Sequence, residues 1–161
     1  MMPAGLWYDS PVTLFEELQG VLGALDSAGV DYALIGALAV AVWGVPRATK
    51  DIDLLVRRED LPRARAAVRD CGFNLEALPL EFKDGTEVQR VSKVDPSGNL
   101  MTVDFMIVDP NLEQAWASRI ILPFGDRRVS VVSRDALIGM KARAARPQDV
   151  MDIQNLEDGD R

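Results

Sequence analysis

The sequence predicts an α/β (α+β) fold, in which a mixed β-sheet is flanked by helices. Helical patterns alternate with short apolar runs in the first half of the chain. After Phe73, polar and apolar residues alternate with the period of two that marks strands. The 161 residues contain no repeat, linker or low-complexity segment and suffice for one buried core. We therefore expect a single domain over residues 1–161, with its core at about 30–156 and an N-terminal helix at about 12–28.

Residues 10–46 predict a helix, a strand and a second helix. In PVTLFEELQGVLGALDSAGV, apolar residues recur with the three- and four-residue spacing of one helix face. These residues are Leu14, Leu18, Val21, Leu22 and Leu25. Ser10 or Thr13 would start this helix. The run DYALIG is a predicted strand. The small apolar residues at 36–42 are typical of a buried helix, which ends at Gly44 and Pro46.

The middle of the chain predicts a strand, a helix and a strand pair. DIDLLV is the strand, and REDLPRARAAVRDCG is an amphipathic helix with Pro62 in its first turn, where the missing N–H costs nothing. TEVQRVSKV and NLMTVDFMIV alternate with period two. Because DPSGN between them carries turn residues, we expect these two strands to pair.

The last third predicts a short helix, a hairpin and two closing helices. In DPNLEQAWASR, Asp109 is a natural N-cap ahead of Pro110. RIILPFGDRRVSVV is predicted to be a hairpin that turns at Gly125 and Asp126. SRDALIGMKARAAR and RPQDVMDIQNLE are predicted helices, separated at Pro147.

The residue types that the chain lacks exclude several chemistries. It contains no histidine, which removes Ser-His-Asp and Cys-His catalysis and every histidine-containing zinc site. Cys71 is the only cysteine, so internal disulfides and thiolate metal cages are excluded, and it is expected to be a small buried hydrophobe. Any metal must be held by oxygen, which favours magnesium, manganese or calcium.

Charge and hydropathy limit the partners. A formal net charge of −7 argues against a protein that mainly coats nucleic acid, although arginines at 57–69 and 127–146 allow a local basic rim. The longest nearly uncharged run, at 32–46, is shorter than a membrane span, and the N-terminus does not resemble a secretory signal. We therefore expect no membrane partner and a cytoplasmic protein.

Asp51 and Asp53 stand out because they lie within an apolar strand. Residues two apart on a strand point to the same face, so the two carboxylates would repel unless a cation lay between them. Asp104 in TVDFMIV is again a lone acid within an apolar strand, and it would join the pair if the two strands are neighbours. Three such oxygen ligands suit a two-metal site for phosphoryl or nucleotidyl transfer. The alternative interpretation is that the acids are solvated caps at strand ends.

Gly36 lies between the predicted strand and helix that precede these acids. A glycine turn at this place presents backbone N–H groups at a helix N-terminus, which suits phosphate. Simple tight packing is the alternative explanation for Gly36.

Together these motifs resemble the nucleotidyltransferase superfamily with the DNA polymerase β-type fold. The family pattern is a hydrophobic residue, Gly, then Gly or Ser, a helix, and D-x-D or D-x-E on the next strand. Here it corresponds to Ile35, Gly36, Ala37, thirteen intervening residues and DID. Within the superfamily, GVPRATKDIDLLV and LIGMKARAARPQDVMDIQNL most resemble the bacterial abortive-infection AbiEii-type nucleotidyltransferases and their small relatives. The resemblance extends from about Val30 to Leu156.

The resemblance implies a role for each motif residue. It makes Asp51, Asp53 and Asp104 the ligands of Mg²⁺ or Mn²⁺, with Asp104 also activating the attacking hydroxyl. Lys141 would lie near the phosphates, although a cation near a helix C-terminus also stabilises the helix without any other function. The residues implied to contact nucleotide, or in part the acceptor, are Gly36, Ala37, Arg47, Thr49, Lys50 and an acid that is either Asp149 or Asp152.

The function implied is transfer of a nucleoside monophosphate from an NTP to a hydroxyl, with release of pyrophosphate. The acceptor would be the 3′ end of an RNA such as tRNA, a protein or a small molecule, and a toxin–antitoxin or phage-defence partner is implied. Ala37 departs from the usual Gly or Ser, and it lacks the serine hydroxyl that would add about 1–3 kcal/mol of phosphate binding. Two alternatives stay open. One is a catalytically degenerate interaction module of a toxin–antitoxin pair, and the other is a phosphohydrolase that releases inorganic phosphate.

Overall fold

The computed structural model describes residues 14–45, 49–144 and 146–158. Its helices are α1 (Leu14–Ser27), α2 (Gly36–Val42), α3 (Leu61–Arg69), α4 (Glu113–Ala117), α5 (Arg134–Ala144) and α6 (Pro147–Asp158). Its strands are β1 (Ala33–Ile35), β2 (Asp51–Val56), β3 (Leu75–Glu76), β4 (Leu80–Glu81), β5 (Glu87–Val94), β6 (Leu100–Ile107), β7 (Ile120–Phe124) and β8 (Arg127–Val131).

The strands form one mixed sheet in the order β3-β5-β6-β2-β1-β8-β7, with β4 also paired to β5. β2 runs parallel to β6 and β1 parallel to β8, while the remaining pairs are antiparallel. The predicted mixed α/β architecture is therefore confirmed, as are the two predicted hairpins, β5–β6 and β7–β8.

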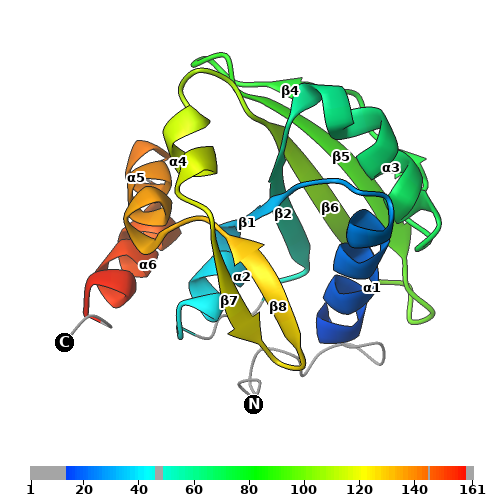
Figure 1. The fold of residues 1–161 in the computed structure, drawn as a ribbon, viewed down its shortest axis with the longest axis horizontal. Coiled ribbons are helices and arrows are strands. Elements are labelled where there is room, and N and C mark those ends of the chain that lie inside the picture. The colour runs from blue at the N-terminus through cyan, green and yellow to red at the C-terminus, as the bar shows by residue number, and fades with distance from the viewer. Residues whose placement is uncertain (1–13, 46–48, 145, 159–161) are drawn as a thin grey trace.

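The helices pack in groups around the sheet (Figure 1). α1 lies beside α3, and α5 pairs with α6 on the opposite side of the molecule in this view. The buried residues of α1 are those whose spacing predicted it: Leu14, Leu18, Val21, Leu22 and Leu25. The central strands complete the core, where Leu34, Leu54 and Phe105 are fully buried. At the end of α2, the Trp43 indole N–H donates to the Val132 carbonyl at 3.1 Å and ties the helix to the segment after β8.

Three local features differ from the sequence prediction. β3 and β4 were not predicted, because two exposed residues each give no periodic pattern. The helix expected from Arg58 onward begins at Leu61, after a 3₁₀ turn at Arg58–Asp60. The prediction that Asp109 is the N-cap was wrong: its carboxylate accepts the Leu112 N–H at 3.0 Å in the turn before α4, and Leu112 itself holds the cap position.

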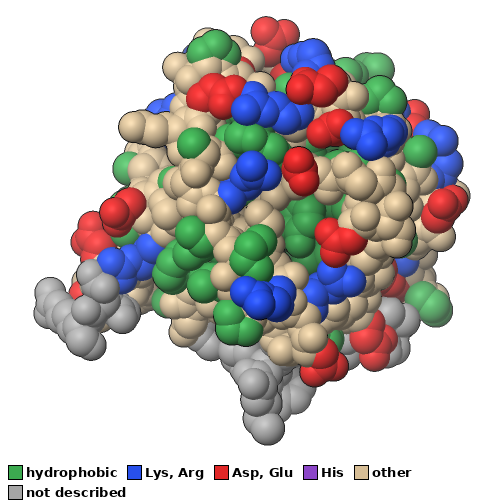
Figure 2. Space-filling view, viewed as in Figure 1, with side chains coloured by type: hydrophobic (Ala, Val, Ile, Leu, Met, Phe, Trp, Pro, Cys, Tyr) green, Lys and Arg blue, Asp and Glu red, His purple; other side chains and the backbone are tan. Residues whose placement is uncertain are grey.

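The surface carries no dominant charge on the face shown in Figure 2. Acidic and basic side chains alternate over it, with apolar side chains between them. No helix of the described ranges has both the length and the apolar character needed to cross a membrane.

Candidate active site

The structure brings the three predicted carboxylates together. β2 and β6 are parallel neighbours whose register sets Asp53 beside Asp104 and Asp51 beside Thr102. Because Asp51 and Asp53 are two apart on β2, both side chains share the face on which Asp104 projects. The strand pairing on which the sequence interpretation depended is thus present in the fold.

The three acids carry more negative charge than their surroundings neutralise. Burial, and then the charges of Asp104 and Asp51, raise the pKa of Asp53 to about 7, while Lys141 and Arg90 act in the opposite direction. Burial and Asp104 also raise the pKa of Asp51. The donor atoms are all carboxylate oxygens, so their chemistry, rather than their present arrangement, suits a hard divalent cation such as Mg²⁺ or Mn²⁺.

Gly36 lies directly against this acidic cluster. β1 pairs antiparallel with β2 so that Ile35 is opposite Asp53, and the next residue, Gly36, begins α2. Gly36 has φ +71°, and a Cβ built there would lie 2.3 Å from Asp53 Oδ2. Only glycine allows this approach, because any side chain would overlap the carboxylate. Ala37, the next residue, is buried.

Arg90 is the residue at this site that the sequence analysis missed. It lies on β5 directly opposite Asp104 on β6. Its Nε donates to Asp104 Oδ1 at 2.8 Å and its Nη2 to Oδ2 at 2.9 Å, so both carboxylate oxygens are engaged. In the described part of the chain, no group of three or more His, Cys, Asp or Glu side chains is arranged to hold a metal ion. Asp104 is the member of the predicted set that is already paired.

Lys141 lies in a buried ion network that joins α5 to α6. Its Nζ is 2.9 Å from Asp152 Oδ2 and 3.6 Å from Asp149 Oδ1, and all three side chains are almost fully buried. Arg146 also pairs with Asp149, with Nε 2.8 Å from Oδ2. Both acids therefore pair with Lys141, and Asp152 is the closer. Which of the two faces the nucleotide stays a prediction. The positive charge of Lys141 lowers the pKa of Asp53. This network is therefore close enough to act on the cluster of Asp51, Asp53 and Asp104.

We expect Lys141→Met to destabilise the protein by about 3 kcal/mol, because it leaves two buried carboxylates without their shared cation. Chemical denaturation measures this loss. Arg143→Met, on the same helix but exposed, is the matched control and should change stability by less than about 0.5 kcal/mol. Equal stability of the two variants would contradict a structural role for Lys141.

Three residues before β2 were predicted to contact nucleotide or acceptor, and the structure describes two of them, Thr49 and Lys50. Thr49 accepts the Asp51 backbone N–H through Oγ1 at 3.2 Å and so fixes the start of β2. Lys50 is exposed, and its carbonyl accepts the Thr102 N–H at 3.3 Å. Arg47 lies outside the described residues. The assignment of these residues to nucleotide or acceptor stays a prediction.

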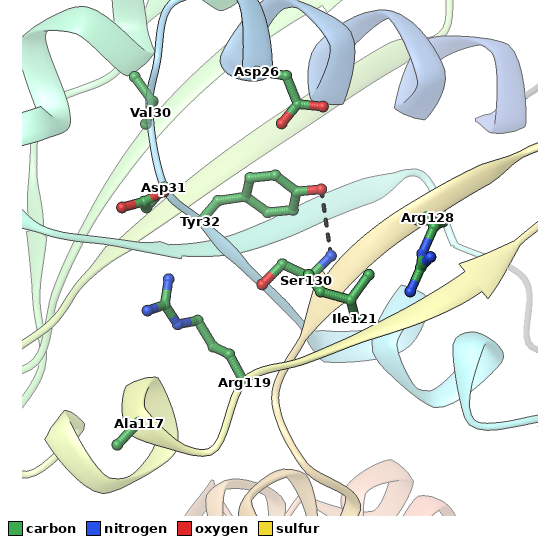
Figure 3. Close-up of a pocket in the computed structure, with 9 residues that line it drawn as sticks. All are labelled: Asp26, Val30, Asp31, Tyr32, Ala117, Arg119, Ile121, Arg128 and Ser130. Atoms are coloured by element: carbon green, nitrogen blue, oxygen red, sulfur yellow. Dashed lines mark hydrogen bonds between the residues drawn. The ribbon is translucent and has the colours of Figure 1, made fainter.

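A pocket of about 530 Å³ opens at the start of β1, whereas Gly36 lies at the end of that strand. Figure 3 shows Tyr32 at its centre, with the Ser130 N–H donating to the Tyr32 hydroxyl at 3.4 Å. Arg119 lines the pocket and also stacks its guanidinium on the Trp116 ring at 3.8 Å. None of the predicted site residues lines this pocket, so it is separate from the carboxylate cluster.

The fold is that of a nucleotidyltransferase, as comparison with solved structures shows. The Thermotoga maritima protein TM1012, assigned as a nucleotidyltransferase, aligns with a TM-score of 0.65 at 13% identity over 98% of this chain and 96% of its own. The lincosamide antibiotic adenylyltransferase LnuA gives a TM-score of 0.62 at 18% identity over 88% and 95%. The antibiotic-resistance factor ANT(2'')-Ia gives 0.61 at 17% over 87% and 80%. At these identities the likeness establishes the fold and not the substrate.

The chain belongs to the AbiEii family, described as nucleotidyl transferase AbiEii toxin of type IV toxin–antitoxin systems, whose model matches residues 22–160. It is therefore a nucleotidyltransferase-family enzyme, and the resemblance noted from its motifs is confirmed. No match was found among curated proteins.

Proposed function

We propose that this protein uses Mg²⁺ or Mn²⁺ to transfer a nucleoside monophosphate from an NTP to a hydroxyl acceptor. The observation that supports this is the register of β2 and β6, which sets Asp53 beside Asp104 while Gly36 approaches Asp53 from β1. Carboxylates for a divalent cation and a glycine turn for phosphates then lie within one site.

Each of the grouped residues has a task in this proposal. Asp51, Asp53 and Asp104 would hold the divalent cation, which supplies charge neutralisation for the triphosphate and the leaving pyrophosphate. The turn at Gly36 and Ala37 receives phosphate oxygens through backbone N–H groups. Asp104 accepts the proton of the attacking hydroxyl. Lys141, held by Asp152 and close enough to influence Asp53, contributes positive charge beside the phosphates.

The acceptor that we propose to test first is the 3′ hydroxyl of an RNA, tRNA in particular, as the resemblance to AbiEii-type toxins implies. Protein and small-molecule hydroxyls are the other acceptors. LnuA is an antibiotic adenylyltransferase, and ANT(2")-Ia has been solved with adenylyl-2"-tobramycin, so the fold also serves small acceptors. A cognate antitoxin is the proposed biological partner, since the family is one of toxin–antitoxin toxins.

A labelling assay tests the proposal. Protein, Mg²⁺ and each of the four α-labelled NTPs are incubated with total cellular RNA and soluble protein, beside the Asp51→Asn/Asp53→Asn double variant. We expect label in an RNA band, lost with the variant by at least about a hundredfold because the cation loses two ligands. Release of inorganic phosphate without label would indicate a phosphohydrolase instead. The absence of both products would favour an interaction module, in which Ala37 marks a lost activity.

A further inference from the structure

Of the three carboxylates that we propose as cation ligands, Asp104 is the one that Arg90 already holds in an ion pair. We propose that Arg90 competes with the divalent cation for Asp104, so that the metal-free protein carries its own counter-ion and exchanges it for metal. This inference rests on the function proposed above, and it assigns Arg90 a positioning and regulatory role at the same site.

The Arg90–Asp104 pair engages both carboxylate oxygens of Asp104. Nε and Nη2 of Arg90 reach the two carboxylate oxygens at 2.8 and 2.9 Å, the bidentate arrangement that makes arginine–carboxylate pairs strong and directional. The two residues are directly opposite on antiparallel strands, so the register of the sheet brings the guanidinium within reach of the carboxylate. A cation that binds Asp104 must share these two oxygens with the guanidinium, whose positive charge repels it.

Arg90 already performs part of the task of a cation. Its guanidinium is paired directly with Asp104, and Asp104 is the strand neighbour of Asp53. One guanidinium brings one positive charge to a cluster of three carboxylates. A divalent cation supplies twice the charge and would balance them better.

The two members of the pair differ in their exposure to solvent, so Arg90 can leave the pair more easily than Asp104 can. The Arg90 side chain is 42% exposed, whereas that of Asp104 is only 12% exposed. The guanidinium can therefore rotate into solvent on its flexible stem while the carboxylate stays fixed within β6. Because a half-exposed ion pair contributes little net free energy, metal can displace it at modest cost.

Metal binding without nucleotide tests this competition directly. Electron paramagnetic resonance of free Mn²⁺ measures its affinity for the full-length protein, for Arg90→Gln, for Asp104→Asn and for the double variant. We expect Arg90→Gln to bind Mn²⁺ about threefold to tenfold more tightly, since the cost of displacing the guanidinium disappears. In the Asp104→Asn background the same substitution should change affinity by less than about twofold, because the shared partner is gone.

Two further variants control for charge and for folding. Arg128→Gln removes one positive charge from an exposed residue of β8 and should leave Mn²⁺ affinity within about twofold of the parent. Arg90→Lys keeps the charge but cannot form the bidentate contact, so its affinity should lie between those of the parent and Arg90→Gln. If Arg90→Gln does not fold, as circular dichroism would show, the increase in affinity of Arg90→Lys decides the question.

The outcomes separate this inference from the proposed function. Unchanged Mn²⁺ affinity in both Arg90 variants, or an Arg90→Gln effect that persists without Asp104, would overturn the competition. The proposed metal site would then stand if Asp51→Asn still abolished Mn²⁺ binding. Failure of the parent and of both Arg90 variants to bind Mn²⁺ would overturn the competition and the metal site together.

Discussion

Replacing Asp53 with asparagine is expected to make the metal-free protein more stable at pH 8 while abolishing nucleotidyl transfer. The carboxylate is held ionised at this pH against burial and against Asp104 and Asp51, which together raise its pKa to about 7. Asparagine has similar shape and no charge. We expect the free energy of unfolding to rise by about 2 kcal/mol, less than the full shift implies because the side chain is partly solvated.

The pH dependence of this gain follows from the direction of the shift. The folded state binds the Asp53 proton more tightly than the unfolded chain does, so the penalty is absent below about pH 4. It develops as the pH rises from about 4 to 7 and is complete above that range. The stability difference between Asp53→Asn and the parent should therefore be small at pH 4 and largest at pH 8.

Thermal denaturation of both proteins at several pH values, in the presence of a chelator, measures this difference. Glu81→Gln, which removes one exposed acid from β4, is the control and should change stability by less than about 0.5 kcal/mol at every pH. Added Mg²⁺ should stabilise the parent and not Asp53→Asn, because only the parent keeps the full ligand set. An Asp53→Asn protein that is less stable than the parent at pH 8 would show that the carboxylate is satisfied without a metal.

The acidic part of this site could be predicted from the sequence because it violates the apolar pattern around it. Asp51, Asp53 and Asp104 interrupt strands that are otherwise buried, and such violations have few explanations apart from a ligand. Gly36 was identified by its place between a strand and a helix. Its positive φ and its approach to Asp53, however, are properties of the three-dimensional pairing of β1 with β2.

Arg90 and the ion network of Lys141 could not be predicted in the same way. Arg90 lies among polar residues such as Gln89 and Ser92, as a solvent-facing strand residue would, and nothing in that pattern fixes the register against β6. The DPSGN turn predicted that the strands pair, but the partner of Arg90 follows only once the register is known. For Lys141, helical position was compatible with both a phosphate contact and a structural ion pair. Its burial between Asp149 and Asp152 depends on the packing of α5 against α6.

Gly36→Ala is expected to cause the largest combined loss of stability and activity among single substitutions that leave every proposed ligand in place. A non-glycine residue at φ +71° is strained, and the added Cβ would lie 2.3 Å from Asp53 Oδ2 and 3.0 Å from Asp53 Cβ and Cγ. Strain and overlap together should lower the free energy of unfolding by about 3 kcal/mol. Displacing Asp53 by even about 1 Å should lower the transfer rate by about a hundredfold.

Gly44→Ala separates these two causes. Gly44 closes the same helix with φ +97°, but a Cβ there would meet nothing within 4 Å. This control should lose only about 1 kcal/mol, the cost of the backbone conformation, and keep its transfer rate within about twofold. Denaturation curves and the labelling assay measure both variants. If Gly36→Ala behaves like Gly44→Ala in both measurements, glycine is required at position 36 only for its backbone conformation. If it loses far more, the glycine is required because Asp53 needs the space, and the turn and the carboxylates form one site.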